Sequence, residues 1–374
     1  MEKHLHIISF DVPYPADYGG AIDIFYTIQA LQSAGVSIHL HCFEDNREKE
    51  PELNNYCSDV IYYQRRCGHK GFSHVLPYVV GSRSNPELLE NLLKDDYPIL
   101  MYGIHCTYLL LDKRFTNRKV FLRPQQIMYR LYKKLSQLTL SPFKKLYYLH
   151  ESKLLKQYET EIATRARVIA ISDHDRDVYR SEFNAQQVIT IPSFLPYKEI
   201  NSQEGVGCFC LYHGNLGSEE NEKAAMWLLK KVFSGLPVHF IIAGKNPSEK
   251  LEQAVLKQPT ACLVANPSHQ EMQDLINQAQ INVLPSMYNK SVHTKLLNAL
   301  FNGRHCIVND EMIRDSILAP SCHVATTADA FQSVITQLYH HPFEDHEIQL
   351  RKHLLSNYYN TEKNTSLLMN IIWG

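Results

Sequence analysis

Residues 281–309, INVLPSMYNKSVHTKLLNALFNGRHCIVN, contain the pattern that decides the fold. The stretch opens with a short apolar run that ends at Pro285, and a second apolar run, Cys306–Val308, closes it. Between them, Thr294–Asn302 has helical spacing, and Gly303 is the residue type most often found just past a helix end. A strand, a loop, a helix and a strand in this order predict one turn of a doubly wound α/β domain.

The helix predicted within this stretch carries two polar side chains on one face. Lys295 and Asn298 are spaced i and i+3, whereas the apolar residues of the helix share another face. An ammonium and an amide group are therefore expected near a helix N-terminus, at the carboxyl end of a strand. Open α/β sheets bind ligands at this edge, and helix N-termini favour anions. The pattern predicts a site for a nucleotide diphosphate.

Length and composition indicate an ordinary globular protein with two cores. The chain has 374 residues, of which 44% are hydrophobic and 21% charged, with a net charge of −1. No run approaches the roughly 18 apolar residues of a membrane span. The first ten residues, MEKHLHIISF, enter a strand pattern directly, so we expect no signal peptide. The nine cysteines show no metal-ligand spacing, which favours reduced thiols in a cytoplasmic protein.

Strand and helix patterns alternate along the whole chain and predict parallel sheets. The expected strands of the first half are His4–Phe10, Val36–Phe43, Val60–Tyr63, Ile99–Tyr102, Val120–Leu122, Val168–Ser172 and Val188–Ile191. In the second half, Cys208–Tyr212, Val238–Ala243 and Ala261–Ala265 precede the opening stretch. The polar segment 196–207 reads as a linker. We expect two Rossmann-like doubly wound domains that face a cleft, residues 1–195 and 196–355, with a C-terminal helix at about 356–374 that packs back on the first.

Candidate ligand-binding residues follow the predicted strands. They are Gly19, Gly20, His105 and Arg123 in the first half, and Gly214, Asn215, Lys245, Lys295 and Asn298 in the second. Each has a plainer alternative: a turn for the glycines, a structural role for one histidine among 19, and a solvated surface for the lysines and Asn298. No Walker motif or HExxH is present, and Asp173 of the Asp-x-Asp sequence at 173–175 reads as a helix cap. This favours a metal-free reaction in which a lysine and helix dipoles stabilise the leaving phosphate.

Several stretches together resemble group 1 glycosyltransferases of the GT-B fold. In the second half they are LYHGNLGSEENEKAAMWLL, FIIAGKNPS, NPSHQEMQDLINQAQINVLPS and KLLNALFNGRHCIVN, which resemble the donor-binding domain. In the first half PYPADYGG, FLR at 121–123 and YETEIATRARVIAISDHD resemble the acceptor domain. The resemblance covers nearly the whole chain in the right order.

The resemblance implies transfer of a sugar, with retention, from a nucleotide-sugar donor to a glycan or lipid-linked acceptor. No cofactor is implied, since the nucleotide-sugar is the substrate. Gly19 and Gly20 would face the donor diphosphate, Lys295 would bind it and Gly214 would line the donor site. His105 stands where such enzymes keep a histidine near the donor phosphate and is the candidate catalytic residue. Arg123 is assigned to the acceptor side.

Two departures from the family pattern keep other functions open. Asn298 stands where such enzymes usually have a glutamate that binds the ribose, and Gln125–Met128 replaces a polar acceptor-side motif. One alternative is therefore a catalytically weak or inactive relative that binds nucleotide or glycan as a scaffold. Another is an epimerase that acts on the nucleotide-sugar itself.

A basic block lies within the first half. Residues 113–167 hold 14 Lys and Arg against three acidic residues, with aromatic side chains among them. One interpretation is peripheral contact with an anionic membrane, which would place the protein at the inner face of the membrane, or with a lipid-diphosphate acceptor. The other is a solvated helix face. Nucleic acid is not an expected partner, because no nucleic-acid-binding module accompanies the charge.

Overall fold

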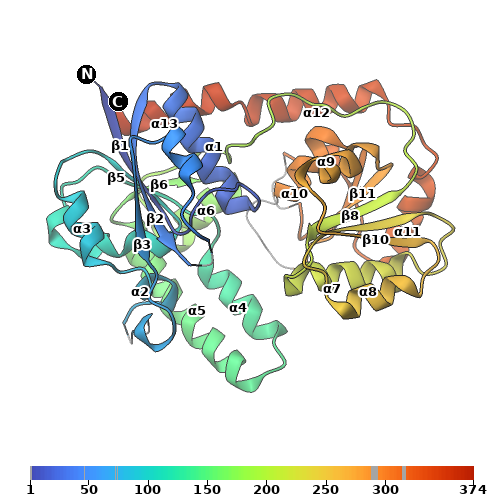
Figure 1. The fold of residues 1–374 in the computed structure, drawn as a ribbon, viewed down its shortest axis with the longest axis horizontal. Helices are drawn as coiled ribbons and strands as arrows, with labels where there is room; N and C mark the ends of the chain where they lie inside the picture. The colour runs from blue at the N-terminus through green and yellow to red at the C-terminus, as the bar shows by residue number, and fades with distance from the viewer. Residues whose placement is uncertain (1, 46, 72, 74, 288–293, 314–316) are drawn as a thin grey trace. The chain divides into compact units, whose positions relative to one another are not determined.

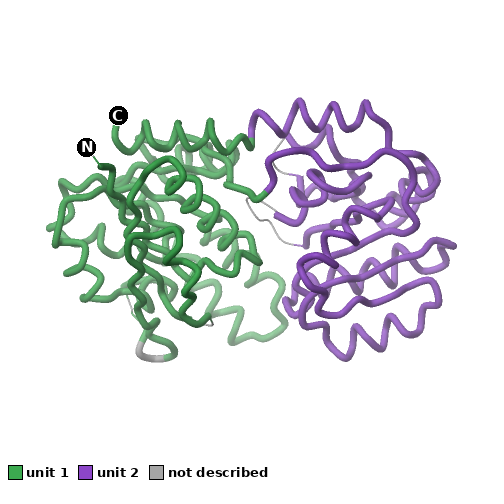
Figure 2. Tube along the Cα trace, turned by 45° about the horizontal axis from the view of Figure 1, so that its top comes forward, with its two compact units in different colours: residues 1–196, 359–374 green, residues 197–358 purple. Residues whose placement is uncertain are grey.

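The computed structural model describes all residues except 1, 46, 72, 74, 288–293 and 314–316. The chain divides into two compact units, shown in separate colours in Figure 2. Unit 1 comprises Met1–Pro196 together with Tyr359–Gly374, and unit 2 comprises Tyr197–Tyr358. Each unit is a parallel sheet with helices, so the expected α/β fold class is confirmed.

Unit 1 contains a seven-stranded sheet in the order β3-β2-β1-β4-β5-β6-β7 (Figure 1). Its strands are β1 (Lys3–Ser9), β2 (Val36–Glu44), β3 (Asp59–Gln64), β4 (Ile99–Tyr102), β5 (Val120–Arg123), β6 (Arg167–Ala170) and β7 (Val188–Thr190). Its helices are α1 (Gly19–Ser33), α2 (Tyr78–Gly81), α3 (Pro86–Leu92), α4 (Met128–Leu138), α5 (Pro142–Ala163), α6 (Asp173–Glu182) and α13 (Thr361–Trp373). Short 3-10 segments are η1 (Pro51–Asn55), η2 (Gly68–Gly71), η3 (Ile104–Leu111) and η4 (Lys113–Phe115).

The sheet of unit 1 is apolar on both faces, as expected of a parallel sheet covered by helices. Along β1, Leu5 and Ile7 face one core and Ile8 faces the other. Helices α1 and α13 complete the first core, and α3, α5 and α6 contribute to the second. The C-terminal helix therefore belongs to the same core as the first helix of the chain.

Unit 2 contains a six-stranded sheet in the order β10-β9-β8-β11-β12-β13. Its strands are β8 (Cys210–Asn215), β9 (Phe240–Lys245), β10 (Ala261–Ala265), β11 (Ile281–Val283), β12 (His305–Val308) and β13 (His323–Val324). Its helices are α7 (Glu219–Trp227), α8 (Glu249–Leu256), α9 (His269–Gln278), α10 (Thr294–Asn302), α11 (Ala328–Leu338) and α12 (Asp345–Tyr358), with a π-helical turn η5 (Leu228–Val232) and a 3-10 turn η6 (Ala319–Ser321).

Two of the expected strands of unit 2 end later than the sequence predicts. Residues after Tyr212 and after Ala243 were expected in loops, but β8 and β9 stay paired there, with Gly214 opposite Gly244. A Cβ atom added at Gly244 would lie 1.8 Å from the carbonyl oxygen of Gly214. The two strands can approach this closely because residue 244 is a glycine.

The C-terminal region also differs from its prediction. A helix was expected at about 356–374, but α12 ends at Tyr358, and Asn360, whose side chain accepts a hydrogen bond from the backbone of Lys363, caps α13. Because asparagine favours an N-cap over a helix interior, α12 and α13 are separate helices that belong to different units. In the part of the chain that the structure describes, no helix is both long and apolar enough to cross a membrane.

Candidate functional site

Each sheet has one position where the strand order reverses, and several of the predicted site residues follow the strands at these positions. In unit 1 the reversal falls between β1 and β4, and in unit 2 between β8 and β11. Ligands of open α/β sheets bind outside the carboxyl ends of such strands. Gly19 and Gly20 follow β1 and His105 follows β4, whereas Gly214 and Asn215 end β8.

Lys295 lies at the start of α10 and is held by side chains from β8 and α7. Its Nζ donates a hydrogen bond to Oδ1 of Asn221 at 3.2 Å and lies 5.0 Å from the ring centre of Tyr212. The hydroxyl of Tyr212 donates to the same Oδ1 at 3.1 Å, and Nδ2 of Asn221 donates to the backbone oxygen of Asn215 at 3.0 Å. Asn221 therefore connects the end of β8 to the predicted phosphate-binding lysine. Asn221 is not among the site residues predicted from the sequence.

His213 is a second residue that the sequence analysis missed as a site candidate. It was placed in a loop, but it belongs to β8, and its side chain is buried. Burial, and then the charge of Lys295, lower the pKa of His213 to about 3. Its Nε2 has no hydrogen-bond partner among the described residues. The ring is therefore neutral at physiological pH, and its unpartnered Nε2 is buried.

Among the described hydrogen bonds, none joins Lys295 to the other predicted residues of unit 2. Asn298, one turn later in α10, accepts a hydrogen bond at its Oδ1 from Asn302 at 2.8 Å. Asn215 and Lys245 are exposed at the ends of the paired strands β8 and β9. The amide of Asn298 is thus directed along its own helix.

In unit 1, the ring of Phe10 lies between two of the predicted residues. A Cβ atom added at Gly20 would lie 2.8 Å from Cζ of Phe10, and the ring of Phe10 stacks on that of His105 at 4.9 Å between centroids. Burial of His105, followed by the charges of Arg83 and Arg65, holds its pKa well below the usual range. The structure therefore brings Gly20 and a neutral His105 to the same end of the sheet.

Arg47, which lies outside the loop between β1 and Gly19, stabilises this loop. Nη1 of Arg47 donates to the backbone oxygens of Val12 at 3.3 Å and Pro15 at 2.7 Å. Its guanidinium also lies 4.8 Å from the ring centre of Tyr18, the residue before α1. The loop that leads to the two glycines is therefore shaped by side-chain contacts, which a search for glycine motifs could not reveal.

Arg123, expected on the acceptor side, has a fully buried side chain that faces the interior of unit 1. Its guanidinium makes two hydrogen bonds of 2.8 Å to the carboxylate of Asp23 in α1, and it also donates to the backbone oxygens of Ile191 and Pro192. Gln125 donates to the same carboxylate at 2.8 Å. These contacts tie α1 and β5 to the segment after β7, so Arg123 is a structural residue in this geometry.

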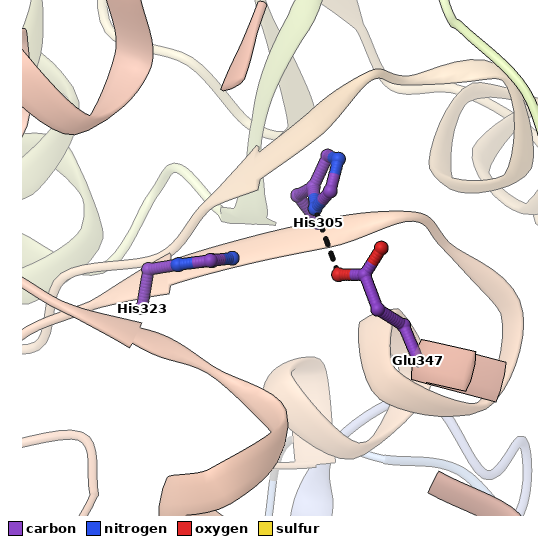
Figure 3. Close-up of side chains that lie close together, drawn as sticks. All are labelled: His305, His323 and Glu347. Atoms are coloured by element: carbon purple, nitrogen blue, oxygen red, sulfur yellow. Dashed lines mark ion pairs between the residues drawn. The ribbon is translucent and has the colours of Figure 1, made fainter. Parts of the chain in front are cut away.

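One group of described side chains could hold a metal ion, and Figure 3 shows it. His305, His323 and Glu347 place their ligand atoms within 4.8 Å of one another, and Nδ1 of His305 lies 3.3 Å from Oε1 of Glu347. Both histidines are the first residues of their strands, β12 and β13. They therefore lie at the amino ends of the strands, at the opposite edge from Lys295. The ion pair of His305 with Glu347 attaches the first turn of α12 to the sheet.

Comparisons with known proteins match a family domain in unit 2 and the fold of the whole chain. Residues 208–341 match the family model described as Glycosyl transferases group 1. A Klebsiella pneumoniae protein, named as an uncharacterized 44.6 kDa protein in cps region, is 27% identical over 317 residues, which cover 79% of this chain and 80% of the relative. The residues that match the family model include Asn221 and Lys295.

Solved structures share the fold over almost the full length of the chain. Sucrose-phosphate synthase from Thermosynechococcus elongatus has a TM-score of 0.72 and 14% identity, and the match covers 99% of this chain and 98% of the synthase. HepE from Anabaena, in complex with UDP and glucose, has a TM-score of 0.66 and 11% identity over 98% of each chain. An Escherichia coli trehalose-6-phosphate protein bound with UDP-2-fluoro glucose also has a TM-score of 0.66, at 9% identity over 100% of this chain and 99% of its own.

Proposed function

We propose, on the premise that this chain carries a group 1 glycosyltransferase domain and has the GT-B fold, that it transfers a hexose from a nucleotide-sugar donor to a glycan or lipid-linked acceptor. The position of Lys295 is the main observation that supports this proposal. It places an ammonium group at the start of a nine-residue helix, outside the sheet position where the strand order reverses. A diphosphate suits this position, because the helix N-terminus and the lysine both favour negative charge.

The donor is a uridine diphosphate sugar in this proposal. Two of the similar structures are named as complexes with UDP and glucose or with UDP-2-fluoro glucose, which supports the choice. Buried His213 lies next to Lys295 and offers a neutral ring to the same ligand. The relative named for its cps region supports a role in polysaccharide biosynthesis.

The reaction is proposed to proceed with retention and without a metal ion. Lys295 and the α10 dipole would stabilise the charge that develops on the leaving diphosphate, as a divalent cation does in other enzymes. The only metal-capable group among the described residues lies at the other edge of the sheet, so it is not assigned a part in the transfer. Activity is expected to persist in EDTA, and a rate that falls on chelation and returns with Mg²⁺ or Mn²⁺ would contradict the metal-free mechanism.

Titration calorimetry with UDP, GDP and their hexose conjugates tests the donor site. Removal of a charge-assisted contact to phosphate costs about 1.5–3 kcal/mol, so Lys295→Ala is expected to weaken UDP binding at least about tenfold. Lys257→Ala, which removes an exposed lysine at the end of α8, is the matched control and should bind like the parent. Equal affinity of the parent and Lys295→Ala for every nucleotide tested would contradict the proposed site.

A scaffold that binds the donor without turnover is the second candidate, and Asn298 favours it. The amide of Asn298 donates no described hydrogen bond toward Lys295, and its oxygen is engaged by Asn302. Release of UDP and transfer of labelled hexose, measured with and without an acceptor-containing lipid extract, decide between the two functions. Transfer by the parent excludes the scaffold. Donor binding with no UDP release under any condition would support it.

A further inference from the structure

The hairpin of α4 and α5 presents a cluster of large apolar side chains at its tip, residues 139–149. Leu140 is 100% exposed, Phe143 87% and Leu146 70%, and Tyr147 and Leu149 are exposed as well. Single exposed apolar residues are ordinary on protein surfaces, but a contiguous group marks a contact site. The tip therefore has the composition of a surface that another phase or molecule covers.

The exposure arises from an ordered helix start. Ser141 caps α5 by accepting a hydrogen bond from the backbone of Lys144, and Pro142 occupies the first turn, where its fixed φ suits a helix. Phe143, Leu146 and Tyr147 are spaced i, i+3 and i+4, so they lie on one face of this first turn. The chain fixes these side chains outward in a helical geometry.

The base of the same hairpin is packed on unit 1, because Met128, Leu155 and Ile162 are buried in one of its cores. Hydrogen bonds within the hairpin also hold α4 to α5 at this base. The backbone N–H groups of Met128 and Tyr129 donate to the two carboxylate oxygens of Glu159 at 2.9 and 3.0 Å, and the hydroxyl of Ser152 donates to the backbone oxygen of Tyr129. Figure 1 shows the two helices side by side, with their connection projecting beyond the other helices of unit 1 at the lower edge of the view. A rigid base thus carries an apolar tip.

The charges beside the tip are all positive. Lys133 and Lys144–Lys145 are exposed, Lys134 is half-buried, and residues 131–150 contain no acidic side chain. Earlier residues of the basic block behave differently, since Ile127 and Met128 are buried in the core of unit 1. Within residues 113–167, the exposed apolar side chains therefore lie together with the lysines at the hairpin tip.

We propose that the hairpin tip docks on an anionic lipid bilayer. Leu140, Phe143 and Leu146 would enter the boundary between headgroups and acyl chains, while the lysines face the lipid phosphates. A second copy of the chain is the less suitable occupant, because two apposed tips would bring lysines of like charge together. Docking does not require glycosyl transfer, so this proposal does not depend on the function proposed above.

Co-sedimentation of the full-length protein with vesicles tests the docking. We expect binding to vesicles of 70% phosphatidylcholine and 30% phosphatidylglycerol, none to pure phosphatidylcholine, and a decrease as salt rises from about 50 to 300 mM. Leu140→Ser with Phe143→Ser and Leu146→Ser should abolish binding. Lys144→Ala with Lys145→Ala should lower the partition coefficient roughly 25-fold, at about fivefold per lysine.

Matched controls lie on other exposed surfaces. Leu256→Ser removes an apolar side chain that is 78% exposed in unit 2, and Lys352→Ala with Lys363→Ala removes two exposed lysines. Both controls should bind vesicles like the parent. Lys295→Ala should do so too, which separates a failure of docking from a failure of the donor site.

A fluorescent variant reports insertion directly. Phe143→Trp is expected to shift its emission to the blue on adding phosphatidylglycerol vesicles, relative to the parent with its two tryptophans. Absence of vesicle binding by the parent would overturn the proposal. So would binding that survives loss of the three apolar side chains, since that would be charge adsorption alone. Dimers in light scattering that disappear in Phe143→Ser, without vesicle binding, would assign the tip to a second copy of the chain.

Discussion

The pair of Arg123 and Asp23 is expected to dominate the stability of unit 1 at the scale of single residues. Both side chains are fully buried, and removing one partner of such a pair leaves an uncompensated charge, at a cost of about 3–5 kcal/mol. Arg123→Met should lower the free energy of unfolding by that amount in urea titrations. Arg176→Met, which breaks surface pairs with Asp173 and Asp177, should cost only about 1 kcal/mol.

A double variant distinguishes this explanation from a simple packing defect. Asp23→Leu combined with Arg123→Met removes both charges, and it should regain part of the stability lost in Arg123→Met. A double variant that is less stable than the parent by the sum of the two single effects would show that the charges act independently.

Asn221 is expected to control donor affinity through Lys295. Asn221→Ala removes one hydrogen bond to the lysine, which contributes about 0.5–1.5 kcal/mol, so affinity for UDP should fall about 2- to 10-fold. Asn221→Asp should weaken binding further, because the new carboxylate pairs with Lys295 and repels the diphosphate. Calorimetry measures both effects. Tighter UDP binding by Asn221→Asp would show that Lys295 does not meet a phosphate.

Lys295 could be predicted from the sequence, whereas Asn221 could not. The lysine follows a loop and begins a strongly periodic helix, and Thr294–Asn302 is helical in the structure over the predicted range. Asn221 acquires its role through a contact with a residue 74 positions later in the chain. Nothing in the local pattern around Asn221 distinguishes it from an ordinary residue of a first helical turn.

At the scale of elements, β1 and β2 share a ladder of histidines that should make stability depend on pH. Nδ1 of His6 lies 2.9 Å from Nε2 of His41, and the ring of His41 meets the hydroxyl of Tyr63 at 2.9 Å. Burial, followed by the charges of His6 and His39, lowers the pKa of His41 to about 3. Histidine in an unfolded chain has a pKa of about 6.5.

Between these two values the unfolded state binds a proton that folded His41 does not. The free energy of unfolding should therefore be highest above pH 6.5 and should fall as the pH decreases from 6.5 toward 3, by up to about 1.4 kcal/mol per pH unit for this residue. His41→Gln should flatten the dependence between pH 6.5 and 5 in urea titrations. Exposed His353→Gln is the control, and an equal change in slope for both variants would contradict the assignment to His41.

Element boundaries show where local patterns fail. The alternation of strands and helices predicted both sheets, because burial of a parallel sheet on two faces imposes apolar runs of limited length. The ends of β8 and β9 were missed because Gly214 and Gly244 look like turn residues until their pairing is known. The break at Asn360 was missed because the apolar spacing continues on both sides of it.

At the scale of the whole molecule, unit 1 should depend on a helix that follows unit 2 in the chain. Leu368 and Ile372 of α13 are fully buried in the core that α1 completes. Full burial of such a side chain contributes about 1.5–3 kcal/mol, so a chain that ends at Tyr358 should lose at least about 3 kcal/mol of stability in unit 1. Unit 2 should unfold as it does in the full chain.

The two tryptophans make this test specific. Trp227 lies in unit 2 and Trp373 in unit 1, so Trp373→Phe and Trp227→Phe variants of the full chain report each unit by fluorescence. The shortened chain retains Trp227, and circular dichroism follows unit 1 there. A shortened chain in which both units keep the midpoints of the parent would show that α13 is dispensable.

The placement of α13 also sets the order in which a nascent chain can fold. Translation must pass through residues 197–358 after the rest of unit 1 has emerged, which takes on the order of ten seconds or more at ordinary elongation rates. Unit 2 is continuous and can fold as soon as it leaves the ribosome. Throughout that interval the apolar surface that later packs against Leu368 and Ile372 is exposed to water. This exposure makes it a binding site for chaperones that recognise apolar segments during synthesis.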